Sequence, residues 1–323
     1  MKKYVEIGNV KIKRTAVLAP MASVTDRAYR LICKKFGAAL VYSEMVSVKG
    51  IYYNLERSED YLRITDEERP MAIQLFGEDE EFFERVLPTV LEYKPDIIDI
   101  NMGCPVNKVV RSNSGCALMK NSKVAEKIVR KVVSNSNVPV TVKIRKGWDN
   151  NSVNAVEFSK MLQDCGVSAI AVHGRTKEQL FRGRADWDIV RKIKESVSVP
   201  IILNGDIFSL DDARKAYETT DADLIMIGRG SFGMPFIFKQ IEEFYERGKI
   251  LKEPEKEEIL ETMLEHIKNI FKFEGKVKGA KKARAQAMRY FSGFKKAAEI
   301  RRRCSLISCF EDVLEIAESA KNF

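Results

Sequence analysis

The chain has 323 residues, of which 45% are hydrophobic and 31% charged, and its formal net charge is +9. This composition is typical of a globular protein with a substantial core, and no stretch reaches the roughly 18 apolar residues of a membrane span. The N-terminus meets an acid at Glu6 and lacks the apolar segment of a signal peptide. We therefore expect a cytoplasmic, monomeric protein without membrane contact.

The cysteines and histidines exclude several classes of site. Six cysteines show no C-x-x-C pair and no metal-like spacing with the two histidines, His173 and His266. We therefore predict no metal site, no iron–sulfur cluster and no disulfide framework. Five of the cysteines are interpreted as small buried apolar residues, and His266, between charged neighbours on a helix, is expected at the surface.

Eight short apolar segments recur along the chain and predict strands. They cover residues 16–18, 40–42, 71–75, 97–100, 140–144, 169–172, 200–203 and 224–227. Apolar residues at helical spacing fill the gaps, for example at 124–133. Apolar strands alternating with amphipathic helices indicate a parallel sheet covered by helices, and eight units in about 215 residues predict an α/β fold of the (β/α)8 TIM-barrel type. A doubly wound open sheet is the alternative.

A polar or glycine-containing tip follows each predicted strand. The tips contain Pro20, Met21 and Ala22; residues 43–45; Gln74; Asn101 with Cys104; Lys143 with Arg145; His173; Asn204, Gly205 and Asp206; and Gly228, Arg229 and Gly230. Barrel enzymes place their active sites at this end of the strands. The ring of tips therefore predicts an active site.

Cys104 differs from the other cysteines because it stands on a strand tip, in a stiff Gly-Cys-Pro turn. A thiol there could move a proton, attack an electrophile or bind a metal. Its unperturbed pKa of about 8.5 leaves it protonated at neutral pH, which makes a proton donor chemically natural.

Two further tips carry specific chemistry. Lys143 interrupts an apolar strand, so it needs an anion, a Schiff base or an electron-rich ring as partner unless it reaches solvent. His173 is either a site residue or a satisfied core histidine. The glycines at 204–206 and 228–230, with Arg229, lie after strands seven and eight, where barrels commonly bind phosphate. A phosphorylated ligand follows from this pattern.

The last part of the chain changes in character. Residues 246–258 are charged and read as a linker, and 259–323 read as helices with an apolar stripe from Ile259 to Phe271. Between Lys268 and Arg303 thirteen Lys or Arg face two acids, a local net charge of +11. Aromatic residues are interleaved, as in nucleic-acid surfaces, so we favour RNA binding over a merely solvated helical face.

At this point the motifs resemble a known family. Residues 19–26 (APMASVTD), 74–77 (QLFG), 99–105 (DINMGCP), 143–148 (KIRKGW), 172–176 (VHGRT), 204–207 (NGDI) and 227–229 (IGR) are similar to those of flavin-dependent tRNA-dihydrouridine synthases. The resemblance covers about residues 10–245 in order. It is strongest to the bacterial B-type branch.

The resemblance implies a cofactor, a reaction and a set of site residues. FMN would be held by Pro20, Met21, Ala22, Gln74, Lys143, His173, Asn204, Gly205, Asp206, Gly228 and Arg229. NADPH or NADH would reduce FMN, hydride would pass from flavin N5 to uridine C6, and Cys104 would protonate C5. Residues 1–245 would be the catalytic barrel and 259–323 the RNA-binding domain, with RNA contacts expected at Asn101, Arg145, Arg284, Arg289 and Tyr290.

The helix that should grip RNA departs from the family pattern. Family members often carry Arg-Lys-His followed by Trp-Tyr, whereas here only Arg284 and Tyr290 of that set remain. A tRNA is the implied substrate, and a ribosomal RNA uridine is the alternative. Other classes remain open: an FMN barrel acting on a small molecule, as in dihydroorotate dehydrogenases, a phosphosugar lyase using Lys143, or a non-catalytic RNA-binding protein.

Overall fold

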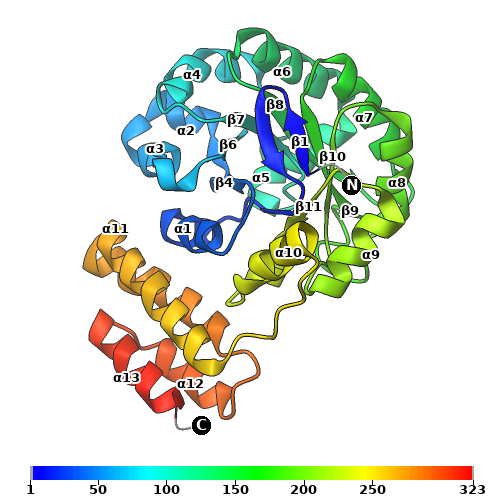
Figure 1. Ribbon diagram of the computed structural model, residues 1–323. Coiled ribbons are helices and arrows are strands. Elements are labelled where there is room, and N and C mark those ends of the chain that lie inside the picture. The colour runs from blue at the N-terminus through cyan, green and yellow to red at the C-terminus, as the bar shows by residue number, and fades with distance from the viewer. Residues whose placement is uncertain (1–2, 322–323) are drawn as a thin grey trace.

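A computed structural model describes residues 3–321, and its parallel strands form a barrel (Figure 1). In sequence order these strands are β3 (Ala16–Leu18), β4 (Val41–Tyr42), β6 (Met71–Phe76), β7 (Ile97–Met102), β8 (Val140–Gly147), β9 (Ala169–Thr176), β10 (Ile201–Asn204) and β11 (Leu224–Ile227), and β5 (Val46–Ser47) adds to β6. Their spatial order is β3, β11, β10, β9, β8, β7, β6, β4. The ends meet where Leu18 N–H donates to the Leu40 carbonyl at 2.9 Å. The predicted (β/α)8 barrel is confirmed.

An outer layer of helices covers the barrel (Figure 1). It consists of α1 (Arg27–Lys35), α2 (Val48–Tyr53), α3 (Leu55–Leu62), α4 (Glu80–Glu92), α5 (Asn107–Arg111), α6 (Ser122–Asn135), α7 (Ala155–Asp164), α8 (Trp187–Ser196), α9 (Leu210–Thr220) and α10 (Phe236–Arg247). Short polar side chains begin several of them: Asp26 accepts from Tyr29 N–H at 3.0 Å and Ser209 from Asp212 N–H at 3.1 Å. Such caps satisfy backbone donors that the first helical turn leaves free.

A hairpin that the sequence pattern did not predict precedes the barrel. It consists of β1 (Tyr4–Ile7) and β2 (Val10–Lys13), which pair antiparallel. Ile7 and Ile12 are fully buried and belong to the same apolar cluster as residues at the strand beginnings, such as Ile97. The hairpin therefore closes the end of the barrel opposite to the strand tips.

Three helices follow the barrel and pack into a second apolar core. They are α11 (Lys256–Tyr290), α12 (Ala297–Cys304) and α13 (Phe310–Lys321), joined to α10 by residues 248–255. In Figure 1 they lie beside α1 and α10. The predicted stripe is buried, with Ile259 and Ile270 in this core. α11 bends at Gly275, whose φ of 70° is readily adopted only by glycine.

None of the helices within residues 3–321 is both long enough and apolar enough to cross a lipid bilayer.

Candidate active site

A cavity of about 370 Å³ opens at the carboxyl ends of the barrel strands. Its lining includes every residue that the family resemblance implies for the cofactor, namely Pro20, Met21, Ala22, Gln74, Lys143, His173, Asn204, Gly205, Asp206, Gly228 and Arg229. Asn101, Cys104 and Arg145 line it as well. Parallel strands in register bring the tips together: Asn101 pairs with Lys143, and Arg145 with His173.

The floor of the cavity is a network of buried amide and carboxyl groups. The Asp99 carboxylate accepts from Gln74 Nε2 and from Thr141 Oγ1, both at 2.6 Å. The Gln74 oxygen accepts from Asn101 Nδ2 at 2.8 Å. Burial raises the pKa of Asp99 to about 6, although both hydrogen bonds and the charge of Lys143 lower it. The network fixes which way each amide points, because reversing one would set donor against donor.

The turn that carries Cys104 is held by the same network. The Asn101 oxygen accepts the backbone N–H groups of Gly103 at 3.2 Å and Cys104 at 2.9 Å. On its other side, Gly115 has φ +60°, and a Cβ there would lie 2.8 Å from the Cys104 carbonyl oxygen. Glycine at 115 therefore lets the chain pass close behind the thiol.

The thiol of Cys104 keeps its proton at neutral pH. Burial raises its pKa above the usual value, while a backbone hydrogen bond and the charges of Arg145 and Lys143 oppose the rise. A thiol in this state can donate a proton to a bound substrate, and the resulting thiolate would lie near two cations that stabilise it.

Lys143 brings an ammonium group into the cavity with no carboxylate bonded to it. Its residue is 9% exposed, and within residues 3–321 its Nζ has no hydrogen-bond or ion-pair partner. Burial, aided by the charge of Arg145, lowers its pKa to about 8, although Asp99 raises it. A buried cation of this kind is costly unless a ligand offers it negative charge.

Arg145 is buried, and its side chain donates hydrogen bonds to the backbone of two loops. Its Nε donates to the Gly103 carbonyl at 3.0 Å, and its Nη1 donates to the carbonyls of Thr176 at 2.8 Å and Leu180 at 2.7 Å. The guanidinium group is 2% exposed. It therefore ties the turn before Cys104 to the loop after β9.

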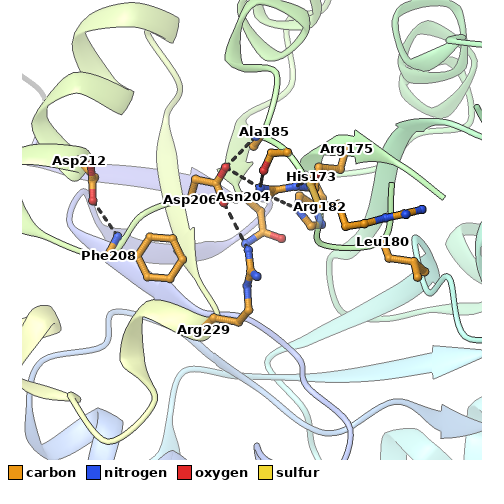
Figure 2. Close-up of polar contacts among 12 residues, drawn as sticks. His173, Arg175, Leu180, Arg182, Ala185, Asn204, Asp206, Phe208, Asp212 and Arg229 are labelled. Carbon is orange, nitrogen blue, oxygen red and sulfur yellow. Dashed lines mark hydrogen bonds and ion pairs between the residues drawn. The ribbon is translucent and has the colours of Figure 1, made fainter. Parts of the chain in front are cut away.

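The opposite edge of the cavity is built around Asp206 (Figure 2). Its carboxylate accepts from Arg175 Nη2 at 2.6 Å and from Ala185 N–H at 2.7 Å, and Arg229 Nη2 lies at 3.3 Å. Arg175 Nη1 is 3.3 Å from Nε2 of His173. Burial first, and then the surrounding cations, keep the pKa of His173 well below 6.5, so its ring is neutral at pH 7.

Two glycines let backbone come close at this edge. Gly205 has φ +118°, and a Cβ there would lie 2.9 Å from the His173 ring. A Cβ on Gly230 would lie 2.1 Å from the Ile207 carbonyl oxygen. The two loops therefore pack closely against each other, and the partly exposed Arg229 gives this edge a positive charge suited to an anion such as phosphate.

Several residues of the cavity escaped the sequence reasoning. Phe181 is 53% exposed, and its ring lies 4.9 Å from the Arg229 guanidinium and 5.6 Å from that of Arg145. Phe208 and Phe232 also line the cavity. They lie in irregular loops, where no periodicity marks a side chain as facing inward, so no signal was available.

The structure places the three predicted RNA contacts of the C-terminal helices, Arg284, Arg289 and Tyr290, in different surroundings. Tyr290 is 2% exposed, and its hydroxyl forms a 3.0 Å hydrogen bond with Nδ1 of His266. The expected RNA contact at Tyr290 does not fit this burial. Arg284 donates through Nε to the Ile307 carbonyl at 2.8 Å, and the Arg289 guanidinium lies 4.0 Å from the Phe232 ring centroid.

The expected surface position of His266 is wrong. The residue is fully buried, and burial lowers its pKa to about 4. Its charged neighbours suggested solvent, but Tyr29 packs at 5.2 Å between ring centroids. Helix α11 is covered on this face by α1, a contact between segments more than 200 residues apart that a local pattern does not reveal.

Within residues 3–321 no three His, Cys, Asp or Glu side chains come together in a way that could hold a metal ion.

The fold and the cavity together define the class. Active sites of (β/α)8 barrels lie at this end, and the strand tips here supply a protonated thiol, a buried ammonium group and an edge that carries Arg229. The protein is a barrel enzyme. Comparison with known proteins gives the family: the sequence model described as "Dihydrouridine synthase (Dus)" matches residues 17–322, and the chain belongs to this family of oxidoreductases.

Individual relatives agree over nearly the whole chain. The chain is 40% identical over 287 residues to "tRNA-dihydrouridine synthase B" of Pasteurella multocida, covering 89% of this chain and 86% of that one. It is 36% identical over 313 residues to the protein of the same name from Vibrio cholerae, covering 97% of both. It is 38% identical over 320 residues to the "Probable tRNA-dihydrouridine synthase" of Rickettsia conorii, covering 99% and 96%.

Solved structures with low sequence identity share the fold. Histamine dehydrogenase from Rhizobium sp. 4-9 superposes with a TM-score of 0.60 at 16% identity, over 82% of this chain and 50% of that one. The old yellow enzyme homologue from Zymomonas mobilis superposes with a TM-score of 0.55 at 14% identity, over 77% and 93%.

Proposed function

We propose that this enzyme reduces the C5=C6 bond of uridines in RNA to dihydrouridine, with FMN as its cofactor. The observation that carries the proposal is that the Cys104 thiol, protonated at neutral pH, shares one cavity with the unpaired ammonium of Lys143 and the anion-binding edge at Arg229. A proton donor, a partner for an electron-rich ring and a phosphate site are the three features that this reaction needs.

The residues present suit FMN. Gly205 and Gly230 let the chain pack closely at the edge of the cavity, and Arg229 adds a positive charge there that suits a phosphate. Lys143 has no carboxylate of its own to neutralise it, so it is available to the polar edge of a flavin ring. When bound, FMN would supply hydride to uridine C6, and NADPH or NADH would reduce the flavin again. The chain itself holds the base, excludes water and supplies the C5 proton from Cys104.

We propose that the base contacts Asn101 and Arg145. Both line the cavity next to Cys104, and Asn101 is oriented by Gln74. A uridine reaches this depth only if it leaves its stack, which favours a nucleotide in a folded loop of RNA. Proteins of the same family are named for tRNA, and we propose tRNA as the substrate class, with a ribosomal RNA uridine as the alternative.

Charge on the surface supports a polyanionic substrate. Exposed basic residues of the helical region include Lys268, Lys272, Lys276, Lys278, Lys281, Arg301 and Arg302. At the barrel mouth the ammonium groups of Lys120 and Lys177 lie 4.5 and 4.6 Å from the Trp148 ring centroid. We propose residues 1–245 as the catalytic barrel and 259–323 as the RNA-binding domain; residues 1–2 and 322–323 lie outside the described part. The linker expected at 246–258 is shorter in the structure, because residues 246–247 end α10 and residues 256–258 begin α11, which leaves 248–255 as the connection.

Two measurements test the proposal, one on the purified protein and one on RNA from cells with and without its gene. The purified protein should be yellow, with FMN released on denaturation. Dihydrouridine mapping of tRNA and ribosomal RNA from cells with and without the gene should show positions that lose the modification in its absence. A colourless protein that binds no added FMN, or an unchanged map, would contradict the proposal. An FMN protein with an unchanged map would favour a small-molecule substrate instead.

The low pKa of Lys143 predicts a pH dependence of FMN binding. Because its folded-state pKa is about 8, the ammonium is lost between pH 7 and 9. If only the charged form binds, the affinity of the FMN-free protein should fall about tenfold over this range. Stability should change in the opposite sense, because the unfolded chain keeps this proton up to about pH 10.4, so the contribution of Lys143 to the unfolding free energy rises with pH above 8.

Fluorescence titration of the FMN-free protein at pH 7, 8 and 9 measures the effect. A Lys143→Met variant should bind more weakly at pH 7 and show a flatter pH profile. Lys160→Met, on the exposed face of α7, is the control and should keep the wild-type profile. A wild-type affinity that is constant across this range would remove Lys143 from the cofactor site.

A further inference from the structure

The last turns of α11 rest against two loops that line the cavity. Lys282, Gln286 and Arg289 are spaced four and three residues apart, which places them on one face of the helix. All three contact the barrel: Lys282 Nζ, for example, lies 3.5 Å from the Asp26 carboxylate. This face of the basic helix is therefore turned inward, away from solvent.

The first loop is the one between β3 and α1. Gln286 Nε2 lies 3.4 Å from the carbonyl oxygens of both Ser23 and Val24 and donates to them. Ser23 has φ 61°, a conformation uncommon outside glycine, and its N–H donates to the Glu44 carboxylate. Its neighbours Ala22 and Val24 line the cavity. A strained loop of the site is thus held by Glu44 from the barrel and by Gln286 from the helical region.

The second loop is the glycine-containing one after β11. The Arg289 guanidinium lies 4.0 Å from the ring centroid of Phe232, which lines the cavity. A Cβ on Gly233 would come within 2.2 Å of the Arg289 carbonyl oxygen, so only glycine lets the helix approach this closely. The loop is thereby packed directly against the backbone of α11.

A hydrogen-bond chain links the same loop to α1. The Tyr29 hydroxyl donates to the Ser231 carbonyl at 2.5 Å, and the Ser231 hydroxyl donates to the Gly228 carbonyl at 2.8 Å. The other side of the Tyr29 ring is covered by His266 of α11. The helical region therefore backs the anion-binding edge by a second route.

We propose that Gln286 and Arg289 are positioning residues for the cofactor site, and that the helical region completes the FMN cradle in addition to meeting RNA. The proposal rests on the proposed FMN function. It assigns Arg289 to the loop at Phe232 in place of the RNA contact expected from the sequence. Removing either side chain takes away one of the supports of its loop, which acts in addition to those that the barrel itself supplies through Glu44 and Tyr29.

The side chain of Gln286 allows a sharp substitution. A Gln286→Glu variant keeps the shape of the side chain but replaces its N–H donors by a carboxylate oxygen that faces two carbonyl oxygens. We expect FMN affinity to fall by about tenfold, because one to two hydrogen bonds are lost and the new carboxylate repels the carbonyl oxygens that it faces. Arg289→Met should have a similar effect, and Arg289→Lys, which keeps a cation over Phe232, should restore part of the affinity.

Matched controls come from the same helices. Gln240→Glu makes the same change at a buried glutamine of α10 that forms no hydrogen bond to either loop within residues 3–321, and Arg284→Met removes an arginine of α11 bonded to the Ile307 carbonyl. The full-length protein is freed of FMN and titrated with it, with flavin fluorescence as the signal. The controls should bind FMN within about twofold of wild type.

Three outcomes overturn the inference. If Gln286→Glu and Arg289→Met bind FMN like wild type but lose RNA affinity, these residues are RNA contacts. If the controls weaken FMN binding equally, the effect is a general loss of packing. If the wild-type protein itself binds no FMN, the proposed function fails, and this inference fails with it; that result is recognised before any variant is compared.

Discussion

A Cys104→Ala variant should bind FMN and be reduced by NADPH at the wild-type rate, yet form dihydrouridine at least about a hundredfold more slowly. The reason is that the Cys104 thiol is protonated at neutral pH and lines the cavity just after β7, where it can deliver a proton to C5. Hydride transfer without a proton donor would leave a carbanion at C5 that no positioned acid protonates.

Measuring the two half-reactions separately distinguishes a role of Cys104 as proton donor from a purely structural role. Stopped-flow reduction of the flavin by NADPH reports the first, and oxidation of reduced flavin by RNA under anaerobic conditions reports the second. Cys116→Ala is the matched control, because this neighbouring thiol is buried beneath the site with a pKa near 12 and does not line the cavity. Near-normal product formation by Cys104→Ala would remove Cys104 from the acid role.

Replacing Arg145 by methionine should cost both stability and catalysis. The substitution leaves the carbonyls of Gly103, Thr176 and Leu180 without their donor. An unsatisfied buried acceptor costs about 1–3 kcal/mol, and because water in the cavity reaches part of this region we expect a loss of about 3 kcal/mol in unfolding free energy. Dihydrouridine formation should also slow, because the turn that aims Cys104 loses its anchor to the loop after β9.

Urea unfolding and single-turnover kinetics measure the two effects. Arg182→Met, an exposed arginine of the same loop, should change the unfolding free energy by no more than about 0.5 kcal/mol. If Arg145→Met unfolds like this control while RNA binding collapses, then Arg145 acts mainly as a substrate contact and its backbone hydrogen bonds carry little energy.

Most of the barrel and of its cavity could be predicted from local sequence patterns. Segments such as 97–100 and 224–227 are short, largely apolar runs typical of strands buried in a parallel sheet, and the structure places β7 and β11 there. Once such strands are parallel, geometry brings their carboxyl ends to one edge, so Lys143 and Arg229 meet although 86 residues separate them. The hairpin β1–β2 was not predicted because each strand has only four residues, with a glutamate in β1 and two lysines in β2.

The roles of the basic residues could not be predicted from local sequence patterns. Arg145, Arg289 and Lys143 look alike in the sequence, each a basic residue near a motif. Arg145 is bonded to three carbonyls and Arg289 stacks on Phe232, whereas Lys143 lines the cavity without a partner among residues 3–321. Whether a charge serves a ligand or the fold depends on which acceptors the rest of the chain brings to it, and those acceptors lie up to 57 residues away.

The chain's local patterns thus determine the fold class, the ring of strand tips and the thiol at its centre, because periodicity and strand polarity act over short distances. The tertiary structure decides what surrounds them: the buried His266 and Tyr290, the inward face of α11 and the loops that it supports. These depend on how α11 packs on α1, more than 200 residues earlier, and burial raises or lowers a pKa only after that packing exists.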